Sequence, residues 1–278
     1  MTEPTWTLGD EPQPKPLGFG DWCRVLMLGS LFALAVFGGL ILMLILRLIE
    51  RPFFGQKRPF TPWLTVWVCR LSLGFIGLQV RQVGKPMQHP GVAVCNHASW
   101  LDIFSLNSAS CLYFVSKSEV ASWPGIGWLA KATGTVFIRR DSRDAVKQKQ
   151  VFEARLLAGH RLLFFPEGTS TDGLRVLAFK PTLFAALFSE ALREKLWVQP
   201  VTLAYYSPDD AEPRHYAWWG DMVFGGHLLQ VLATKKQGRV EAVWHTPLRV
   251  ADFADRKALA RACENVVRGA HGALIDES

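Results

Sequence analysis

Residues 91–102 read GVAVCNHASWLD, an apolar run followed at once by a histidine and an aspartate. The run Gly91–Cys95 predicts a buried strand, and the polar residues after it predict a turn into a helix. His97 titrates near neutral pH and can take a proton from an alcohol, while Asp102 can hold the other ring nitrogen. The stretch therefore indicates a strand that carries a general base at its carboxyl end.

The same residues also have a structural interpretation, in which Asp102 caps a helix that begins at Ile103 and His97 is a loop residue. A serine hydrolase would use such a histidine and aspartate too, but its nucleophile sits in a GxSxG turn, which this chain lacks. His97 has no second histidine or cysteine at metal-ligand spacing nearby, so no metal site is predicted.

A second dense run, FFPEGT at residues 164–169, again ends an apolar stretch. In α/β proteins the active site lies at the carboxyl ends of the strands, so two polar motifs at strand ends are expected to share one edge of a sheet. This second run favours the catalytic interpretation of His97 and Asp102 over the structural one.

From about Gly84 onward, short apolar runs alternate with amphipathic segments, which predicts an α/β fold. We expect a mostly parallel mixed sheet flanked by helices, with a membrane-associated helical segment before it. The predicted strands are 91–95, 112–116, 135–138, 161–165, 198–204 and 239–244. The predicted helices are 102–108, 126–133, 142–158, 181–194 and 253–274.

The span Val25–Leu46 contains no charged residue and is long enough to cross a bilayer as a helix. A signal peptide fits less well, because the apolar run is too long and no small-residue cleavage site follows it. This span predicts a membrane helix.

A second apolar stretch runs from Pro62 to Val80, interrupted by Arg70, with Trp63 and Trp67 one helical turn apart. Tryptophans at this spacing are typical of a helix that lies in the membrane interface or is half inserted. A buried core helix is the alternative. We expect residues 1–20 to be a disordered tail, 21–83 to be membrane-anchoring helices, and 84–278 to be the α/β domain.

The chain carries a net charge of +7 and has a pI near 9.3. Basic residues cluster beside the apolar span, at Arg47, Arg51, Lys57 and Arg58. The positive-inside rule places such residues on the cytoplasmic side, where they also attract anionic lipid headgroups. Nucleic acid is not an expected partner, because no nucleic-acid-binding motif accompanies the charge.

The five cysteines are odd in number and show no CxxC spacing. This pattern is typical of a reducing compartment and of a protein without a disulfide framework. Cys95, which precedes Asn96, is interpreted as a small core residue of the strand.

Four blocks in order resemble the glycerolipid acyltransferase family, which includes the 1-acyl-glycerol-3-phosphate acyltransferases. They cover most of residues 84–205 and are similar to the family patterns NHxxxxD, GxxFIxR, FPEGT and VxPV. In this chain the four blocks are Asn96–Asp102, Gly134–Arg140, Phe165–Thr169 and Val198–Val201.

The resemblance implies acyl transfer from a thioester, on coenzyme A or acyl carrier protein, to the hydroxyl of a lysolipid acceptor in the bilayer. His97 would be the general base and Asp102 would orient it. The acceptor hydroxyl attacks the thioester directly, so neither an enzyme nucleophile nor a cofactor is needed. Backbone amides near a glycine turn or a helix start would hold the oxyanion. The expected location is the bacterial inner membrane, with the active site on the cytoplasmic side.

The resemblance also implies an acceptor site. Glu167 would accept hydrogen bonds from the headgroup, its alternative being a turn or cap residue. Arg139, in the position of the family's motif arginine, would bind an anionic group bidentately. Arg140 and Arg143 fit a solvated charge run, and an acidic carrier protein could meet Lys117, Lys131, Arg139 and Arg140. The expected acceptor-binding residues are Asn96, Arg139, Glu167, Gly168, Thr169 and Arg175.

One departure bears on the acceptor. Family members that act on lysophosphatidic acid typically carry FPEGTR, whereas position 170 here is a serine. Each lost charge-assisted bond to a phosphate is worth about 1.5–3 kcal/mol. Either Arg175 replaces that arginine, or the headgroup is not a phosphomonoester.

Residues 165–180 and 216–222 resemble the branch of the family that acylates lyso-ornithine lipid and related aminolipids. That acceptor is favoured, with lysophosphatidic acid, or both lipids, as the alternative. A third interpretation, a non-catalytic membrane adaptor of the same fold, predicts degraded motifs, whereas His97 and Asp102 are both present.

Overall fold

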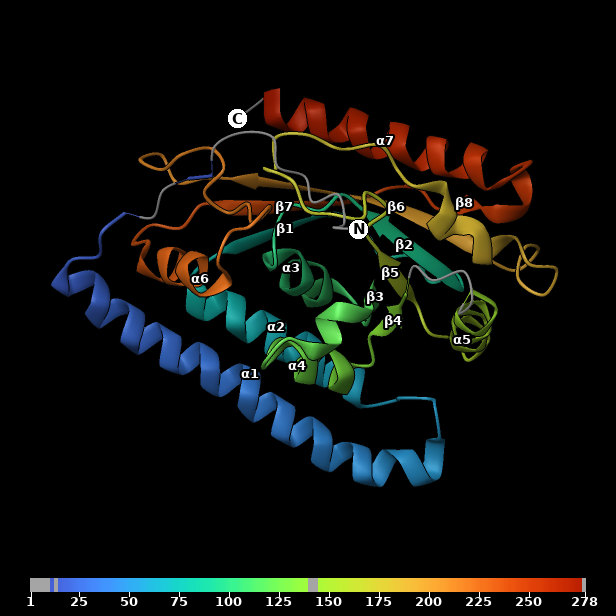
Figure 1. The fold of residues 1–278 in the computed structure, drawn as a ribbon, viewed down its shortest axis with the longest axis horizontal. Coiled ribbons are helices and arrows are strands. Elements are labelled where there is room, and N and C mark those ends of the chain that lie inside the picture. Colours follow the sequence, from blue (N-terminus) through green and yellow to red (C-terminus); the bar gives the residue numbers. More distant parts are fainter. Residues whose placement is uncertain (1–10, 13–14, 140–144, 277–278) are drawn as a thin grey trace.

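The computed structural model describes residues 11–12, 15–139 and 145–276, with an eight-stranded sheet at the centre (Figure 1). Its strand order is β1-β7-β6-β2-β5-β3-β4, with β8 paired to β6. Neighbours are parallel except that β7 and β8 run antiparallel to β6, which confirms the predicted mostly parallel mixed sheet. The strands are β1 Gln79–Gly84, β2 Gly91–Cys95, β3 Tyr113–Lys117, β4 Val136–Ile138, β5 Leu162–Phe164, β6 Trp197–Tyr206, β7 Arg239–Trp244 and β8 Leu248–Arg249.

Helices cover both faces of the sheet (Figure 1). On one face lies α7, and on the other lie α1 to α4 and α6. The α-helices are α1 Phe19–Phe54, α2 Thr61–Ile76, α3 Leu101–Ala109, α4 Ile126–Thr133, α5 Ala145–Leu157, α6 Phe224–Ala233 and α7 Arg256–Asp276, and 3-10 helices span Ser118–Ser122, Pro181–Phe188 and Val250–Asp252.

The strand β2 shows how this layering follows from the sequence. Ala93 and Cys95 belong to the core beneath α1, α2, α3 and α6, whereas Val92 and Val94 belong to the core beneath α7. Successive side chains of a strand point to opposite faces, so an uninterrupted apolar run is what a strand buried on both faces requires. The His97 motif therefore begins at the end of a fully buried central strand.

Helices α1 and α2 form a hairpin whose turn is closed by one buried carboxylate. Glu50, near the end of α1, accepts hydrogen bonds from the backbone amides of Phe60 and Thr61 and from the Thr61 hydroxyl, at the start of α2. Arg47 pairs with the same carboxylate at 2.9 Å. These bonds satisfy donors that a helix start leaves open, and they fix α2 against α1.

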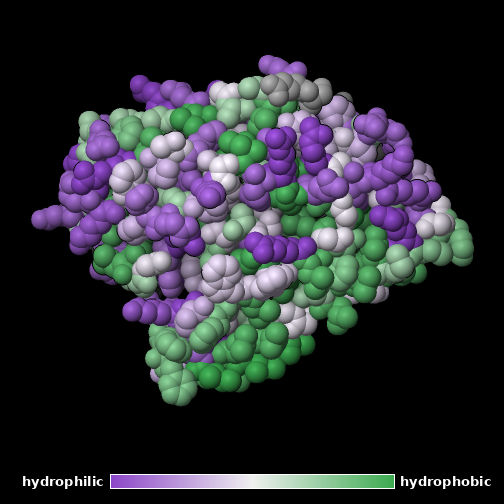
Figure 2. Space-filling model, turned by 180° about the vertical axis from the view of Figure 1, so that it is seen from behind, coloured by the Kyte–Doolittle hydropathy of each residue, from purple (hydrophilic) through white to green (hydrophobic). Residues whose placement is uncertain are grey.

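One stripe of α1 packs on α2, α4 and α6, and the rest of its surface faces away from the described chain. It is a 36-residue helix, long and apolar enough to cross a membrane, and most of its apolar span is exposed. Apolar surface gathers along the same side of the molecule (Figure 2). In α2, Trp63 and Trp67 are exposed while Leu73 and Ile76 are buried. The second apolar stretch therefore has one outward face and one core face.

The structure moves one boundary of the predicted organisation. Helix α2 ends at Ile76, where Gly77 takes a left-handed conformation with φ of +85°. Residues 79–84, which the sequence assigned mostly to the membrane-anchoring segment, form β1 at the edge of the sheet, parallel to β7. The apolar run through Val80 concealed the change from a helical to a strand period at Gly77.

Candidate active site

His97 and Asp102 are in direct contact at the carboxyl end of β2. The His97 Nδ1 atom lies 2.6 Å from Oδ2 of Asp102, which is fully buried in the first turn of α3. The same oxygen accepts hydrogen bonds from the backbone amides of Ala98 and Ser99, at 2.9 and 3.1 Å. Asp102 therefore holds the imidazole and organises the turn before α3. It does not cap a helix that begins at Ile103, because α3 begins at Leu101 and Trp100 is its N-cap residue.

The His97 ring is oriented for proton transfer at its outer nitrogen. An ionised carboxylate only accepts hydrogen bonds, so the contact with Asp102 places the proton of neutral His97 on Nδ1 and the lone pair on Nε2. The ring stacks on Phe165 with centroids 4.0 Å apart, and its side chain is 21% exposed. Within the described residues Nε2 has no hydrogen-bond partner, so it is the nitrogen open to a substrate.

Tyr205 contributes a contact that the sequence did not predict. Its hydroxyl donates to the second oxygen of Asp102, Oδ1, over 2.6 Å. Tyr205 lies near the end of β6, which extends two residues beyond the predicted strand end at Ala204. The VxPV block lies on the same strand, but nothing in the sequence placed this side chain beside Asp102.

Glu167 joins the two motifs through the backbone. Its Oε1 accepts the amide of His97 at 2.8 Å, and its Oε2 accepts the amide of Leu177 at 2.7 Å. Burial raises the pKa of Glu167 to about 8, against the opposite effect of these two amide bonds. The side chain is 1% exposed. Both oxygens of Glu167 thus bond the chain itself, at the loop after β2 and at the loop that contains Leu177, and its predicted bond to a headgroup stays a prediction.

Asn96 is likewise turned toward the protein. Its amide group bonds both the carbonyl and the amide of Leu203, at 2.9 and 2.8 Å, and the residue is buried. The side chain continues the pairing of β2 with β6 one step beyond Cys95 and Val201. Both polar atoms of the Asn96 side chain thus bond Leu203, and its predicted contact with the acceptor stays a prediction.

The remaining FPEGT residues form a tight turn beside the histidine. Gly168 has a φ of +74°, which is left-handed and suits glycine. The Thr169 hydroxyl bonds the carbonyl of Ser170 at 3.3 Å. Thr171 then donates its amide to the carbonyl of His97 at 2.9 Å. This bond holds the turn against the loop that carries His97.

The two arginines assigned to the acceptor site lie in different settings. Arg175 is half exposed and forms two bonds with the buried carboxylate of Asp172, at 3.2 and 3.0 Å. Arg139 is exposed at the end of β4. From β2 to β4 is three strand spacings, which corresponds to about 14 Å. Arg139 therefore lies at the same end of the sheet as His97, three strands away. Arg140 and Arg143 lie outside the described residues.

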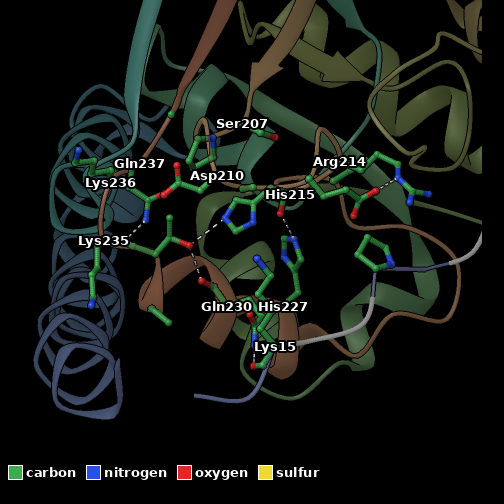
Figure 3. Close-up of a pocket in the computed structure, with 18 of the residues that line it drawn as sticks. Lys15, Ser207, Asp210, Arg214, His215, His227, Gln230, Lys235, Lys236 and Gln237 are labelled. Atoms are coloured by element: carbon green, nitrogen blue, oxygen red, sulfur yellow. Dashed lines mark hydrogen bonds and ion pairs between the residues drawn. The ribbon is translucent and has the colours of Figure 1, made fainter. Parts of the chain in front are cut away.

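An open groove of about 1080 Å³ lies beyond the end of β6, beside α6 (Figure 3). Its lining carries both signs of charge, among them Lys15, Asp210 and Lys236, and includes neither His97 nor Asp102. A hydrogen bond links it to the segment that follows His97, because the Trp100 indole donates to Nδ1 of the lining residue His227 over 2.9 Å. Burial lowers the pKa of His227 to about 4, so this histidine accepts as the neutral form.

Comparisons with known proteins agree on one kind of enzyme. A family model described as Acyltransferase matches residues 75–204. The lyso-ornithine lipid O-acyltransferase of Rhodobacter capsulatus is 53% identical, over 98% of this chain and 99% of the relative. The 1-acyl-sn-glycerol-3-phosphate acyltransferase of Neisseria gonorrhoeae is 42% identical, over 69% of this chain and 74% of the relative.

A solved structure supports the fold. The crystal structure of the 1-acyl-sn-glycerophosphate acyltransferase of Thermotoga maritima has a TM-score of 0.63 at 20% sequence identity. The match covers 91% of this chain and 97% of that chain. Its coverage includes most of the N-terminal helical region as well as the sheet.

Proposed function

The chain belongs to the acyltransferase family, and we propose that it transfers a fatty acyl chain from an acyl thioester to the hydroxyl of lyso-ornithine lipid. That it is an acyltransferase follows from its family. The proposed identity of the acceptor rests mainly on one observation. The chain is 53% identical to a lyso-ornithine lipid O-acyltransferase over nearly the whole of both chains.

In the proposed mechanism, Nε2 of His97 removes the proton of the acceptor hydroxyl as the oxygen attacks the thioester carbonyl carbon. A tetrahedral oxyanion forms and then collapses, breaking the carbon–sulfur bond. The proton held by His97 passes to the departing thiolate. Asp102 stabilises the imidazolium between these two steps. The contact of 2.6 Å between Nδ1 and the Asp102 carboxylate supports this assignment.

The site around FPEGT supports an aminolipid over a phosphomonoester. Position 170 is a serine, and the nearest replacement, Arg175, already pairs with Asp172. An amino-acid headgroup presents one carboxylate and one amine, so it needs less positive charge than a phosphomonoester does. Lysophosphatidic acid remains the second candidate, because the 42% identical relative is a 1-acyl-sn-glycerol-3-phosphate acyltransferase.

We also propose that α1 and the outward face of α2 lie in the bacterial inner membrane, with the active site on the cytoplasmic side. The exposed apolar length of α1 supports membrane association, as do the outward tryptophans Trp63 and Trp67. This placement brings a lipid acceptor to the site, and an acyl-CoA or acyl carrier protein donor would approach from water. Glu167 and Asn96 are proposed as positioning residues, and Arg139 as a headgroup contact.

The deciding experiment crosses two acceptors with two donors on one preparation. Full-length protein in mixed micelles receives lyso-ornithine lipid or lysophosphatidic acid, with acyl-CoA or acyl carrier protein carrying the same chain. We expect a higher kcat/KM for lyso-ornithine lipid with whichever donor is used. A higher kcat/KM for lysophosphatidic acid would reject the proposed acceptor and leave the acyl-transfer mechanism intact.

A further inference from the structure

The carboxylate of Asp102 is fully buried, and its four hydrogen bonds come from four different groups. Oδ2 accepts from Nδ1 of His97 and from the amides of Ala98 and Ser99, and Oδ1 accepts from Tyr205. No lysine or arginine pairs with it among the residues that the structure describes. Its negative charge is therefore balanced only by hydrogen-bond donors until His97 takes up a proton.

Among these donors Tyr205 differs in one respect. The two amides belong to the loop that carries His97 itself, so they move with it. Tyr205 comes from β6, a separate central strand, and it bonds the oxygen that the imidazole does not touch. A hydrogen bond at that oxygen draws negative charge away from the side that faces His97.

We propose that Tyr205 is a positioning residue for acyl transfer, which locks the Asp102 carboxylate and limits how strongly it raises the proton affinity of His97. A general base works best when its pKa lies near the working pH, and a fully buried, uncompensated carboxylate beside an imidazole would make the imidazolium too stable. The bond from the Tyr205 hydroxyl to Oδ1 offsets part of that effect.

The surroundings are consistent with a permanent donor at position 205. Burial, together with the charge of Asp102, raises the pKa of the Tyr205 hydroxyl well above its usual range, so it stays protonated. The other titratable groups that interact with Asp102 are Glu167, from the turn after β5, and Cys95, from β2. Burial raises the pKa of both, which favours their neutral forms, and neither group can supply a positive charge that would replace the Tyr205 donor.

The chain offers a matched control one residue further along. Tyr206 lies on the same strand, but its hydroxyl donates to the carbonyl of Leu274 in α7, at 3.2 Å. Tyr205→Phe and Tyr206→Phe each remove one phenolic oxygen and keep the ring. Only the first removes a bond to Asp102.

The test is the pH profile of kcat/KM for both variants, with thermal unfolding measured alongside. Removing the Tyr205 bond leaves more charge on the carboxylate, so the pKa of His97 rises and more of the base is protonated at a given pH. We expect the acid limb of Tyr205→Phe to move to higher pH by about one unit, which lowers kcat/KM about tenfold on that limb. The KM for the acceptor should be unchanged, and Tyr206→Phe should keep the wild-type limb.

A second substitution strengthens the hydrogen bond to Asp102 instead of removing it. Fluorinated tyrosine at position 205 is a more acidic phenol and hence a stronger donor, so it should move the acid limb to lower pH. The inference is overturned if the acid limb of Tyr205→Phe stays at its wild-type pH, whether or not activity falls. A loss of activity with an unmoved limb would mean a purely structural role.

This inference rests on the proposed function, in which His97 is the base. Experiments can distinguish a failure of the His97 mechanism from a failure of the role proposed for Tyr205. Each profile is measured with whichever acceptor supports turnover, so the identity of the headgroup does not enter. If His97→Ala keeps its activity, the proposed mechanism fails. If His97→Ala is inactive and Tyr205→Phe keeps the wild-type limb, only the role of Tyr205 fails.

Discussion

The sheet edge around His97, meaning the carboxyl ends of β2 and β5, and the α1–α2 hairpin differ in which kinds of side chain they bury and expose. At the sheet edge, polar side chains such as Asn96, Asp102 and Glu167 are buried, and each finds its hydrogen-bond partners within the chain. In the hairpin, large apolar side chains are exposed, with Leu34 at 70% and Leu48 at 77%. The first region is complete by itself, whereas the second needs an apolar partner from outside.

The two regions also differ in what stabilises them: paired hydrogen bonds at the sheet edge, and apolar burial in the hairpin. Burying polar groups is favourable only when every donor and acceptor is paired, so the sheet edge tolerates few changes. Burying apolar groups in a bilayer is additive and non-directional, so the hairpin should tolerate single changes and respond to several. The four predictions below test this difference, from the largest expected effect to the smallest.

Replacing His97 by alanine should cost the most, because it removes the proposed base from a site that has no substitute for it. We expect the rate constant of acyl transfer to fall by about 10²–10⁴-fold. The measurement is single-turnover acyl transfer in micelles, with circular dichroism as a check that the fold persists. A variant that turns over as fast as the wild type would contradict the mechanism.

The hairpin is tested by membrane binding. Each exposed leucine transferred to an apolar phase gains about 1.5–3 kcal/mol, so Leu34→Ser combined with Leu48→Ser should lower vesicle partitioning by about 10²- to 10⁴-fold. The matched control is Val151→Ser with Leu157→Ser, which changes exposed apolar residues of α5. Flotation with vesicles measures both pairs. Equal losses for the two pairs would show that the hairpin face is not specific.

The acceptor preference is tested at the position where the family's arginine is missing. Ser170→Arg adds a guanidinium beside the FPEGT turn, and a charge-assisted bond to phosphate is worth about 1.5–3 kcal/mol, or about 10- to 150-fold. We expect the ratio of kcat/KM for lysophosphatidic acid to that for lyso-ornithine lipid to rise by up to this factor. An unchanged ratio would mean that residue 170 does not reach the headgroup.

The smallest expected effect concerns Glu167 and pH. Its folded-state pKa of about 8 lies above the ordinary value of 4.5. Its contribution to stability is therefore complete below about pH 4.5 and is lost as the pH rises through about 8. Glu167→Gln mimics the protonated form, so the difference in unfolding temperature between wild type and variant should change in favour of the variant from pH 5 to 9. Parallel curves would contradict the prediction.

Several elements were predicted with the same bounds that the structure shows, because residues next to each element signal where it begins and ends. Strand β2 is confirmed at Gly91–Cys95, and helix α4 is confirmed at Ile126–Thr133 between Gly125 and Gly134. Glycines just outside a helix and an apolar run between turn residues are local signals, and they act without help from the rest of the chain.

Other elements were not predicted, because their signals were hidden or came from elsewhere. Strand β1 continues an apolar run that begins in α2, and α6 was not predicted at all. The predicted helix 181–194 is in fact a 3-10 helix at Pro181–Phe188 followed by turns. An apolar residue serves a helix or a strand equally well, and only packing against β7 or α1 decides which one forms.

By itself, the sequence determined that a strand is followed by a histidine with an aspartate five positions further on, and that a long apolar helix precedes that strand. Both are properties of neighbouring residues, and local geometry suffices to read them. Only the tertiary structure decided that Glu167 holds the amide of His97 and that Tyr205 reaches Asp102, across 70 and 103 positions of the chain. Such contacts depend on which strands lie side by side, and that order is set by the packing of the whole sheet between its helices.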